Sequence, residues 1–263
     1  NQLCDRVDRA PVLTALAGRS ITSVAPTTTA TALTSISTGL APGRHGIIGY
    51  RIAVERSVLN VLRWSADGRD ARRAIEPSSI QTHDVFGAQR PPVITRAEFR
   101  ESGFTAAHLG GTRLTATDQL VGALLERLPR GTALVVTSDH GQVDVGANVI
   151  TPAPEVLAHV ALQSGEGRFR WLHARPGHAR QLRAEAERHA DVAWVRTVDE
   201  VIDAGWFGEV TDATRARLGD VALIARDDVS FEDPADSGPY ALVARHGSLT
   251  ADEMYVPLLH TVV

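Results

Sequence analysis

Three short stretches of the chain carry side chains that suit chemistry on a phosphate. The first is a run of threonines that follows Pro26 and ends at Thr29, ahead of a segment in which Leu33 and Ile36 have helical spacing. A hydroxyl at a helix start lies beside free backbone N–H groups and the positive end of the helix dipole, which favours an oxygen nucleophile attacking a phosphate. The alternative is that these threonines only cap the helix and form a turn.

The second stretch is the tetrapeptide Ser138-Asp139-His140-Gly141, which follows the apolar run 133–137. In open α/β sheets, ligands bind beyond the carboxyl ends of the strands, and that is where these side chains are expected. A carboxylate beside an imidazole suits an ion such as Zn²⁺. The alternative is a solvated loop in which the Asp-His pair is incidental.

The third stretch contains His246, which follows a predicted strand at 240–244 and precedes Gly247. A histidine at this place could bind a metal, although a structural role is the alternative. His45 lies beside Gly46 and an apolar strand, so it is predicted to be a structural hydrogen-bonding residue rather than a ligand.

The elements around these stretches have the rhythm of an α/β protein. A short helix is predicted over 30–38, with Gly39 as its stop. An amphipathic helix over 116–128 precedes the apolar run 133–137, which is typical of a strand buried on both faces of a parallel sheet. The main sheet is expected to resume at 220–225. The fold class is therefore α/β, with a mainly parallel sheet flanked by helices.

Residues 151–218 form a predicted inserted α+β subdomain, and residues 1–150 and 219–263 form the predicted core. The insert alternates strands at 168–174 and 192–196 with helices at 177–189 and from 199 to 204, and the first strand is expected to have one wet face. Its four histidines are interpreted as surface or packing residues: His159, His173, His178 and His189. The remaining predictions are a helix at 8–17, strands at 20–24 and 47–54, a polar irregular region at 55–92 and an extended piece at 91–95.

Composition excludes several classes of protein. The chain has 263 residues, a net charge of −4 and 43% hydrophobic residues, which describes a soluble globular protein without the basic surface that a nucleic-acid polymer requires. No apolar run is long enough for a membrane span. The single cysteine, Cys4, excludes an internal disulfide framework and favours a cytoplasmic location. The chain begins at Asn1 rather than at a methionine, so the lack of a leader pattern carries no weight.

Taken together, the three stretches resemble the type I phosphodiesterase/nucleotide pyrophosphatase family of the alkaline phosphatase superfamily. The resemblance rests on Pro26-Thr27-Thr28-Thr29 running on to Thr38-Gly39-Leu40-Ala41-Pro42-Gly43-Arg44-His45-Gly46-Ile47, on Ser138-Asp139-His140-Gly141, and on His246-Gly247. The order and spacing of all three fit, and the likeness covers most of the chain.

The resemblance implies a parallel-sheet core, two divalent metal ions (usually zinc) and a threonine nucleophile. The nucleophile falls on Thr29, with Thr27 or Thr28 as competitors. Asp139 and His140 fall on ligands of one ion and His246 on a ligand of the other. The backbone N–H of Ala30 would assist the phosphoryl oxygens, and Tyr50 stands where family members place an asparagine that binds a phosphoryl oxygen.

The sequence departs from the family pattern in three places. No strand ending in a metal-binding aspartate precedes Asn1, and no Asp and His pair lies between Phe104 and Thr115. The third departure is Tyr50 itself, which weakens the inference that nucleotides are the substrate. We hypothesise that stretches before Asn1 and near Gly111 are missing from this chain. An unbroken Gly110-Gly111-Thr112 in the gene would refute the internal omission.

The function implied is a metal-dependent hydrolase of phosphate esters, namely a phosphodiesterase/nucleotide pyrophosphatase that acts through phosphothreonine on a small-molecule phosphate ester or nucleotide. The alternatives are a phosphomonoesterase, a phosphonate hydrolase or a phosphate mutase of the same superfamily, because a shared core does not choose among them. A non-catalytic relative that has lost metal ligands is a further alternative. A serine hydrolase is disfavoured because no Gly-x-Ser-x-Gly motif occurs. The oligomeric state does not follow from the sequence.

Overall fold

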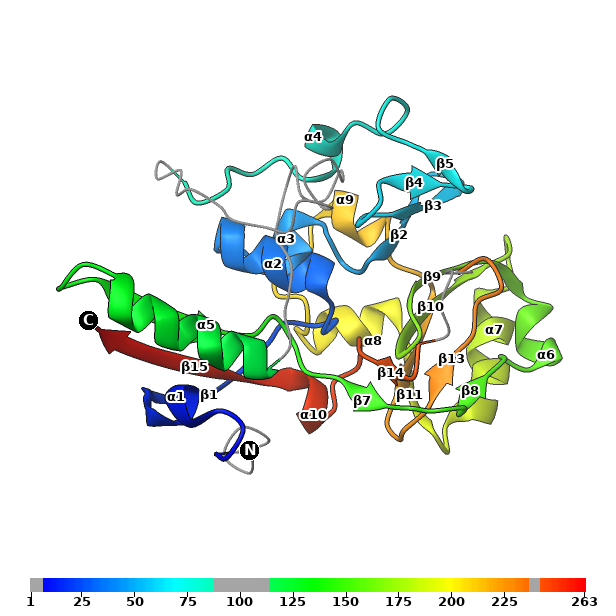
Figure 1. The fold of residues 1–263 in the computed structure, drawn as a ribbon. Coiled ribbons are helices and arrows are strands. Elements are labelled where there is room, and N and C mark those ends of the chain that lie inside the picture. Colours follow the sequence, from blue (N-terminus) through cyan, green and yellow to red (C-terminus); the bar gives the residue numbers. More distant parts are fainter. Residues whose placement is uncertain (1–6, 88–113, 237–241) are drawn as a thin grey trace.

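The computed structural model describes residues 7–87, 114–236 and 242–263 (Figure 1). The helices are α1 (Pro11–Ala15), α2 (Thr29–Thr38), α3 (Pro42–His45), α4 (Pro77–Ile80), α5 (Leu114–Arg127), α6 (Pro154–Leu157), α7 (Ala179–Ala186), α8 (Val198–Asp203), α9 (Asp212–Arg215) and α10 (Ala251–Met254), with a 3₁₀ turn at Glu187–His189. The strands are β1 (Ala17–Thr22), β2 (Arg51–Val54), β3 (Ser57–Asn60), β4 (Ser65–Ala66), β5 (Arg69–Asp70), β6 (Ala133–Thr137), β7 (Val143–Asp144), β8 (Val149–Ile150), β9 (Val160–Glu166), β10 (Phe169–Ala174), β11 (Ala193–Thr197), β12 (Val221–Ala225), β13 (Ser230–Phe231), β14 (Ala244–Arg245) and β15 (Tyr255–Val262).

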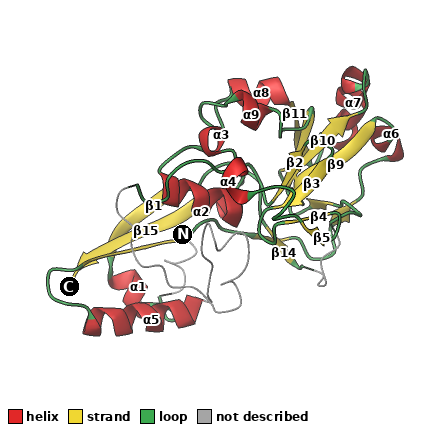
Figure 2. Ribbon diagram, turned by 90° about the horizontal axis from the view of Figure 1, so that it is seen from above, coloured by secondary structure: helices red, strands yellow, loops and turns green. Residues whose placement is uncertain are grey.

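The first sheet has the order β1-β15-β6, and its long strand β15 crosses much of the molecule (Figure 1). Helices α1 and α5 lie together on one side of it (Figure 2), where Leu13 and Val121 pack against Leu259. On the other face Val135 and Val262 are 60% and 69% exposed. The prediction that 133–137 is buried on both faces is therefore wrong: the described part of the fold covers only one face of β6.

The prediction of a mainly parallel sheet is not confirmed. Both β1 and β6 pair antiparallel with β15, and the parallel pairing seen among the described strands is the short one between β8 and β13. An apolar run reports burial but carries no information on strand direction. Here the central strand β15 comes from the chain end, and no helical crossover joins it to β6 as in a βαβ unit.

The second sheet has the order β11-β12-β10-β9 and all its pairings are antiparallel. The predicted resumption of the main sheet at 220–225 is thus wrong, because β12 lies in the centre of this second sheet. The expected wet face of the strand at 168–174 is wrong as well. Phe169, Arg170, Trp171 and Leu172 are all buried, because separate hydrophobic clusters cover the two faces.

The region 55–92, predicted to be irregular, contains a small antiparallel sheet of β2, β3, β4 and β5. These strands are two to four residues long, too short for a periodic pattern to reveal them. Trp64 lies at 2% exposure in this region and anchors it to the core. The predicted extended piece at 91–95 lies outside the described residues.

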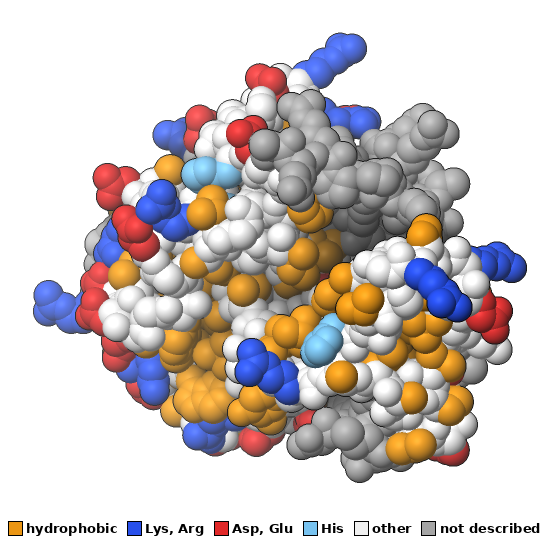
Figure 3. All heavy atoms as spheres, turned by 90° about the vertical axis from the view of Figure 1, so that its left-hand side faces the viewer, with side chains coloured by type: hydrophobic (Ala, Val, Ile, Leu, Met, Phe, Trp, Pro, Cys, Tyr) orange, Lys and Arg blue, Asp and Glu red, His pale blue; other side chains and the backbone are white. Residues whose placement is uncertain are grey.

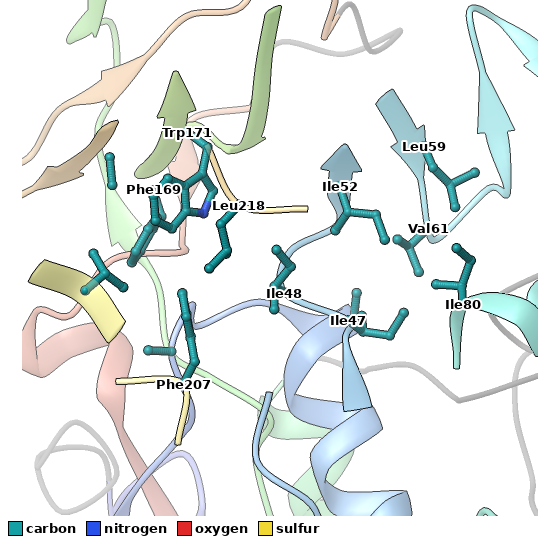
Figure 4. Packing of buried hydrophobic residues seen from close by; sticks show 14 of the residues in the cluster. Ile47, Ile48, Ile52, Leu59, Val61, Ile80, Phe169, Trp171, Phe207 and Leu218 are labelled. Carbon is teal, nitrogen blue, oxygen red and sulfur yellow. The ribbon is translucent and has the colours of Figure 1, made fainter. Parts of the chain in front are cut away.

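One hydrophobic cluster joins three parts of the chain (Figure 4). Ile47 and Ile48 follow α3, Leu59 comes from the small sheet, and Phe169 and Trp171 come from the second sheet. The second sheet, most of which was predicted as an insert, therefore shares a core with the segment that follows the threonine loop.

Several local predictions are confirmed. The threonine helix spans Thr29–Thr38 and ends at Gly39, whose φ of 71° is the left-handed conformation that glycine adopts at low cost. Helix α5 and strand β6 match the expected elements within about two residues. Among the described helices, none has both the length and the apolar character needed to cross a membrane.

Candidate functional site

Thr29 opens helix α2, and its two predecessors do not act as side-chain caps. Thr28 is the N-cap residue, with extended backbone angles of −133° and 144°, yet it makes no capping hydrogen bond through its side chain. Thr27 and Thr28 are fully buried, whereas Thr29 is partly accessible. Thr28 therefore does not cap α2 through its hydroxyl, and of the three threonines Thr29 is the one with an accessible side chain.

The hydroxyl of Thr29 contacts His140. Its Oγ1 lies 3.0 Å from His140 Nε2, while Nδ1 of the same ring lies 2.6 Å from the carbonyl oxygen of Gly141. A carbonyl only accepts, so Nδ1 carries a proton. In the neutral tautomer with this proton, Nε2 is the acceptor and the Thr29 hydroxyl the donor. An Nδ1–H held by a carbonyl is also the arrangement that orients a metal-binding histidine.

His246 lies against His140, and the two rings are stacked with centroids 4.0 Å apart. Its Nδ1 donates to the carbonyl oxygen of Thr27 at 2.9 Å, so its Nε2 is likewise the atom with a free lone pair. Burial, and secondarily the neighbouring His140, lowers the pKa of His246 to about 3. The ring is therefore neutral at physiological pH, as a metal ligand must be.

Asp139 completes the group. Its Oδ2 lies 3.5 Å from His140 Nε2, and its backbone carbonyl accepts a hydrogen bond from the Ser23 hydroxyl. The structure thus brings together Thr29, Asp139, His140 and His246, the four residues singled out by the sequence as nucleophile and metal ligands. They come from the start of α2, the loop after β6 and the loop after β14.

The donor set fits a metal in part. Two neutral imidazoles and one carboxylate are ligands that zinc accepts. However, no cluster of three or more His, Cys, Asp or Glu side chains with the geometry to hold an ion is found among the described residues. The sequence has no Asp and His pair between Phe104 and Thr115 that could add to this set.

Two loops of the site are paired through their backbones. Thr27 N–H donates to the Gly247 carbonyl at 3.2 Å, and Gly247 N–H donates to Thr27 Oγ1 at 3.0 Å. The same hydroxyl donates to the Ser248 carbonyl at 2.7 Å. Thr27 is therefore fully used in holding the two loops together, which argues against its role as a competing nucleophile.

The remaining predicted residues have varied positions. Ala30 is buried in the first turn of α2, where N–H groups lack partners within the helix. The Tyr50 hydroxyl donates to Asp236, and burial raises its pKa. No described contact joins Tyr50 to Thr29 or the site histidines, so its role in substrate binding stays a prediction.

His45 is confirmed as structural: Ile47 N–H donates to its Nδ1 at 3.1 Å, and its Nε2 lies 2.9 Å from Ser35 Oγ.

Sequence reasoning missed a buried charged group behind the site. Arg51 and Arg170 lie against Asp233 and Asp236, with Arg170 nitrogens 3.7 and 3.8 Å from the two carboxylates. Glu166 is 3% exposed and close enough to Arg170 and Asp236 for their charges to act on its pKa. The one available signal was the pair of arginines that flank Phe169 in an otherwise apolar strand.

A cavity of about 370 Å³ lies beside the threonine loop, lined mainly by apolar side chains that include Ala25, Pro42, Trp206 and Leu249. None of the four gathered site residues lines it. Figure 3 shows hydrophobic side chains gathered around a hollow on the face seen from the left of Figure 1.

The sequence model for "Type I phosphodiesterase / nucleotide pyrophosphatase" matches residues 2–112 and 111–249. The chain belongs to this family. It is thus a hydrolase of the phosphodiesterase/nucleotide pyrophosphatase type. The two matched stretches meet at 111–112, where the sequence lacks the expected Asp and His. Comparison with curated protein sequences gives no match.

Solved structures share the fold. Human ectonucleotide pyrophosphatase/phosphodiesterase 5 aligns with a TM-score of 0.67 at 13% identity, covering 97% of this chain and 82% of that one. An inactive murine form of that enzyme in complex with AMP gives 0.66 at 14% identity, with 97% and 84% covered. Phosphonoacetate hydrolase from Sinorhizobium meliloti 1021, in complex with phosphonoformate, gives 0.57 at 16% identity, with 98% and 86% covered. The α/β fold class is confirmed by these likenesses.

Proposed function

We propose that this protein is a metal-dependent phosphodiesterase/nucleotide pyrophosphatase that acts through a phosphothreonine at Thr29. The observation that carries the proposal is the 3.0 Å contact between Thr29 Oγ1 and His140 Nε2, in a group that also contains Asp139 and His246. The substrate class is a small-molecule phosphate ester or nucleotide, and AMP bound to a murine relative of the same fold supports it.

The chain supplies three things to this reaction. It places the Thr29 hydroxyl at the start of α2, where the helix dipole and the N–H of Ala30 favour negative charge on a phosphoryl group. It holds the Thr29 hydroxyl 3.0 Å from His140 Nε2, the atom that would bind an ion in place of this hydrogen bond. It holds the His246 ring in a fixed tautomer through the Thr27 carbonyl. Thr29 is thereby oriented for attack.

The cofactors are proposed to be two divalent ions, with zinc the favoured species. The side chains that would bind them include Asp139, His140 and His246, through one carboxylate and two Nε2 atoms. A bound cation lowers the pKa of a coordinated hydroxyl and stabilises the charge that develops on phosphoryl oxygens.

The test is an assay of hydrolysis with added Zn²⁺ or Mn²⁺ on bis(4-nitrophenyl) phosphate, 4-nitrophenyl phosphate and a phosphonate. Diester turnover that a chelator abolishes is expected. The T29A variant should lose about a thousandfold or more in kcat with an unchanged melting temperature, because it lacks the nucleophile. T38A is the matched control, since it removes a threonine hydroxyl at the far end of the same helix.

Wild-type-like turnover by T29A would contradict the assignment of the nucleophile. Preferred hydrolysis of the phosphonate would favour the phosphonate hydrolase alternative, which the likeness to phosphonoacetate hydrolase supports. Metal analysis gives an independent check: about two bound zinc ions per chain support the enzyme, and none supports a non-catalytic relative.

A further inference from the structure

Glu166 is a buried carboxyl that the proposed chemistry does not use. It ends strand β9 and is 3% exposed. Its Oε2 accepts the backbone N–H of Tyr50 at 3.2 Å, while Oε1 has no hydrogen-bond partner among the described residues. A buried polar atom without a partner is destabilising, and such groups in native proteins commonly mark a functional position.

The side chain of Glu166 lies directly against the loop that carries His246. A Cβ placed on Gly247 would lie 2.5 Å from Glu166 Cγ, so no other residue fits at 247 while Glu166 keeps this position. On the other side, a Cβ placed on Gly49 would lie 3.5 Å from Glu166 Oε1, an ordinary contact distance. Glu166 thus fills the space between the Gly49–Tyr50 backbone and Gly247.

Glu166 also lies near the threonine loop. Burial raises the pKa of its carboxyl to about 8, and the Tyr50 N–H, the Arg170 charge and, least, the nearby Thr28 hydroxyl oppose this shift. Thr28 precedes Thr29, and Gly247 follows His246. The carboxyl therefore lies behind the two loops whose side chains meet at the site.

These two loops are joined by three hydrogen bonds, which form the Thr27–Gly247 bridge. It consists of the Thr27 N–H to the Gly247 carbonyl, the Gly247 N–H to Thr27 Oγ1, and the His246 Nδ1–H to the Thr27 carbonyl. The separation of Thr29 from His246 depends on this bridge, and Glu166 supports it from the buried side.

The end of β9 is itself fixed against the site. Two residues after Glu166, Arg168 forms two hydrogen bonds of 3.0 Å to Glu253, and both side chains are fully buried. Glu253 in turn accepts the N–H of Ser248 at 2.9 Å. Glu166 consequently packs against the Gly247 loop from a strand end that the buried Arg168–Glu253 pair holds in place.

We propose that Glu166 is a positioning residue that sets the geometry of Thr29 and His246 through the Thr27–Gly247 bridge, without contacting substrate. The kinetic part of this proposal rests on the proposed function. The structural part, the integrity of the bridge, does not, so the two can fail separately.

The structural test is hydrogen–deuterium exchange of the Thr27 and Gly247 amides in E166A, E166D and E166Q. The control S164A removes another buried polar group, which contacts His173 from the same strand. Exchange should be about tenfold faster in E166A and intermediate in E166D, whose carboxyl is withdrawn by one methylene. E166Q and S164A should match the wild type. Unchanged exchange in E166A, or in E166D if E166A does not fold, would overturn the proposal.

The kinetic test uses the metal-loaded protein and bis(4-nitrophenyl) phosphate. E166A should lower kcat about 30-fold with little change in KM, because misplacement of the reacting groups by a fraction of an ångström slows the chemical step. Rescue by E166Q is expected, since Gln keeps the shape and the acceptor for Tyr50. An unchanged kcat in E166A, or failure of Gln to rescue, would contradict a positioning role. If the wild type hydrolyses no ester, the proposed function fails and the exchange experiment alone decides.

Discussion

At the scale of single residues, the tautomers of two histidines explain how this site is built. In each ring Nδ1 donates to a backbone carbonyl, of Gly141 for His140 and of Thr27 for His246. Both Nε2 atoms are left with lone pairs, one of which contacts the Thr29 hydroxyl. Sequence motifs identified these three side chains but could not show the carbonyls that orient them, because those contacts are made by backbone.

Glu166 gives a prediction for the pH dependence of stability. Burial raises its pKa from the ordinary 4.5 to about 8. Between these values the native protein keeps a proton that the unfolded chain has lost, so stability falls as the pH rises through this window. The E166Q variant lacks this titration. As the pH rises through this window, the free energy of unfolding of E166Q minus that of the wild type should therefore increase by at most about 1.4 kcal/mol per pH unit.

Urea denaturation from pH 5 to pH 8.5, with a chelator present, measures this difference. E126Q, which alters an exposed carboxyl on α5, is the control and should track the wild type. A constant difference between E166Q and wild type across the window would show that Glu166 is ionised in the native state.

At the scale of elements, the contact between the β9–β10 turn and α10 joins the second sheet to the site. It rests on the pair of Arg168 and Glu253, both with fully buried side chains. Removal of one partner from a buried ion pair leaves an uncompensated charge and costs about 3–5 kcal/mol. R168M should therefore destabilise the protein by this amount.

The double variant R168M/E253Q tests the origin of that loss. The amide introduced by E253Q keeps an acceptor for the Ser248 N–H but carries no charge, so the double variant should recover part of the stability, with a coupling of about 1–3 kcal/mol. R188M breaks the exposed pair with Glu185 and should change little. Additive single effects in denaturant unfolding would contradict a direct ionic interaction.

Elements with strong local signals were predictable, and those defined by tertiary pairing were not. The spacing of Leu33 and Ile36 and the stop at Gly39 define α2, and the leucines of α5 define that helix. Strand β10 was misjudged because Arg168 and Arg170 imply solvent, whereas buried carboxylates pair with them. The place of β12 in the second sheet depends on partners far away along the chain.

At the scale of the whole molecule, the site exists only because distant segments meet. Thr29, His140 and His246 lie more than a hundred residues apart along the chain, yet a hydrogen bond and a stacked ring pair join them. The order of the three motifs was enough to predict this meeting, because the family pattern encodes it. Sheet direction and the mixed core of Figure 4 were not predictable, since no local pattern records which strands become neighbours.

The central claim is that Thr29 attacks phosphorus. The most direct measurement is a single-turnover reaction with bis(4-nitrophenyl) phosphate and Zn²⁺, quenched in acid and followed by peptide mass spectrometry, with T29A as the control. We expect a nitrophenylphosphoryl group on Thr29 in the wild type and none in T29A. Release of nitrophenol with the phosphoryl group on Thr27, Thr28 or any other residue, or on no residue at all, would contradict it.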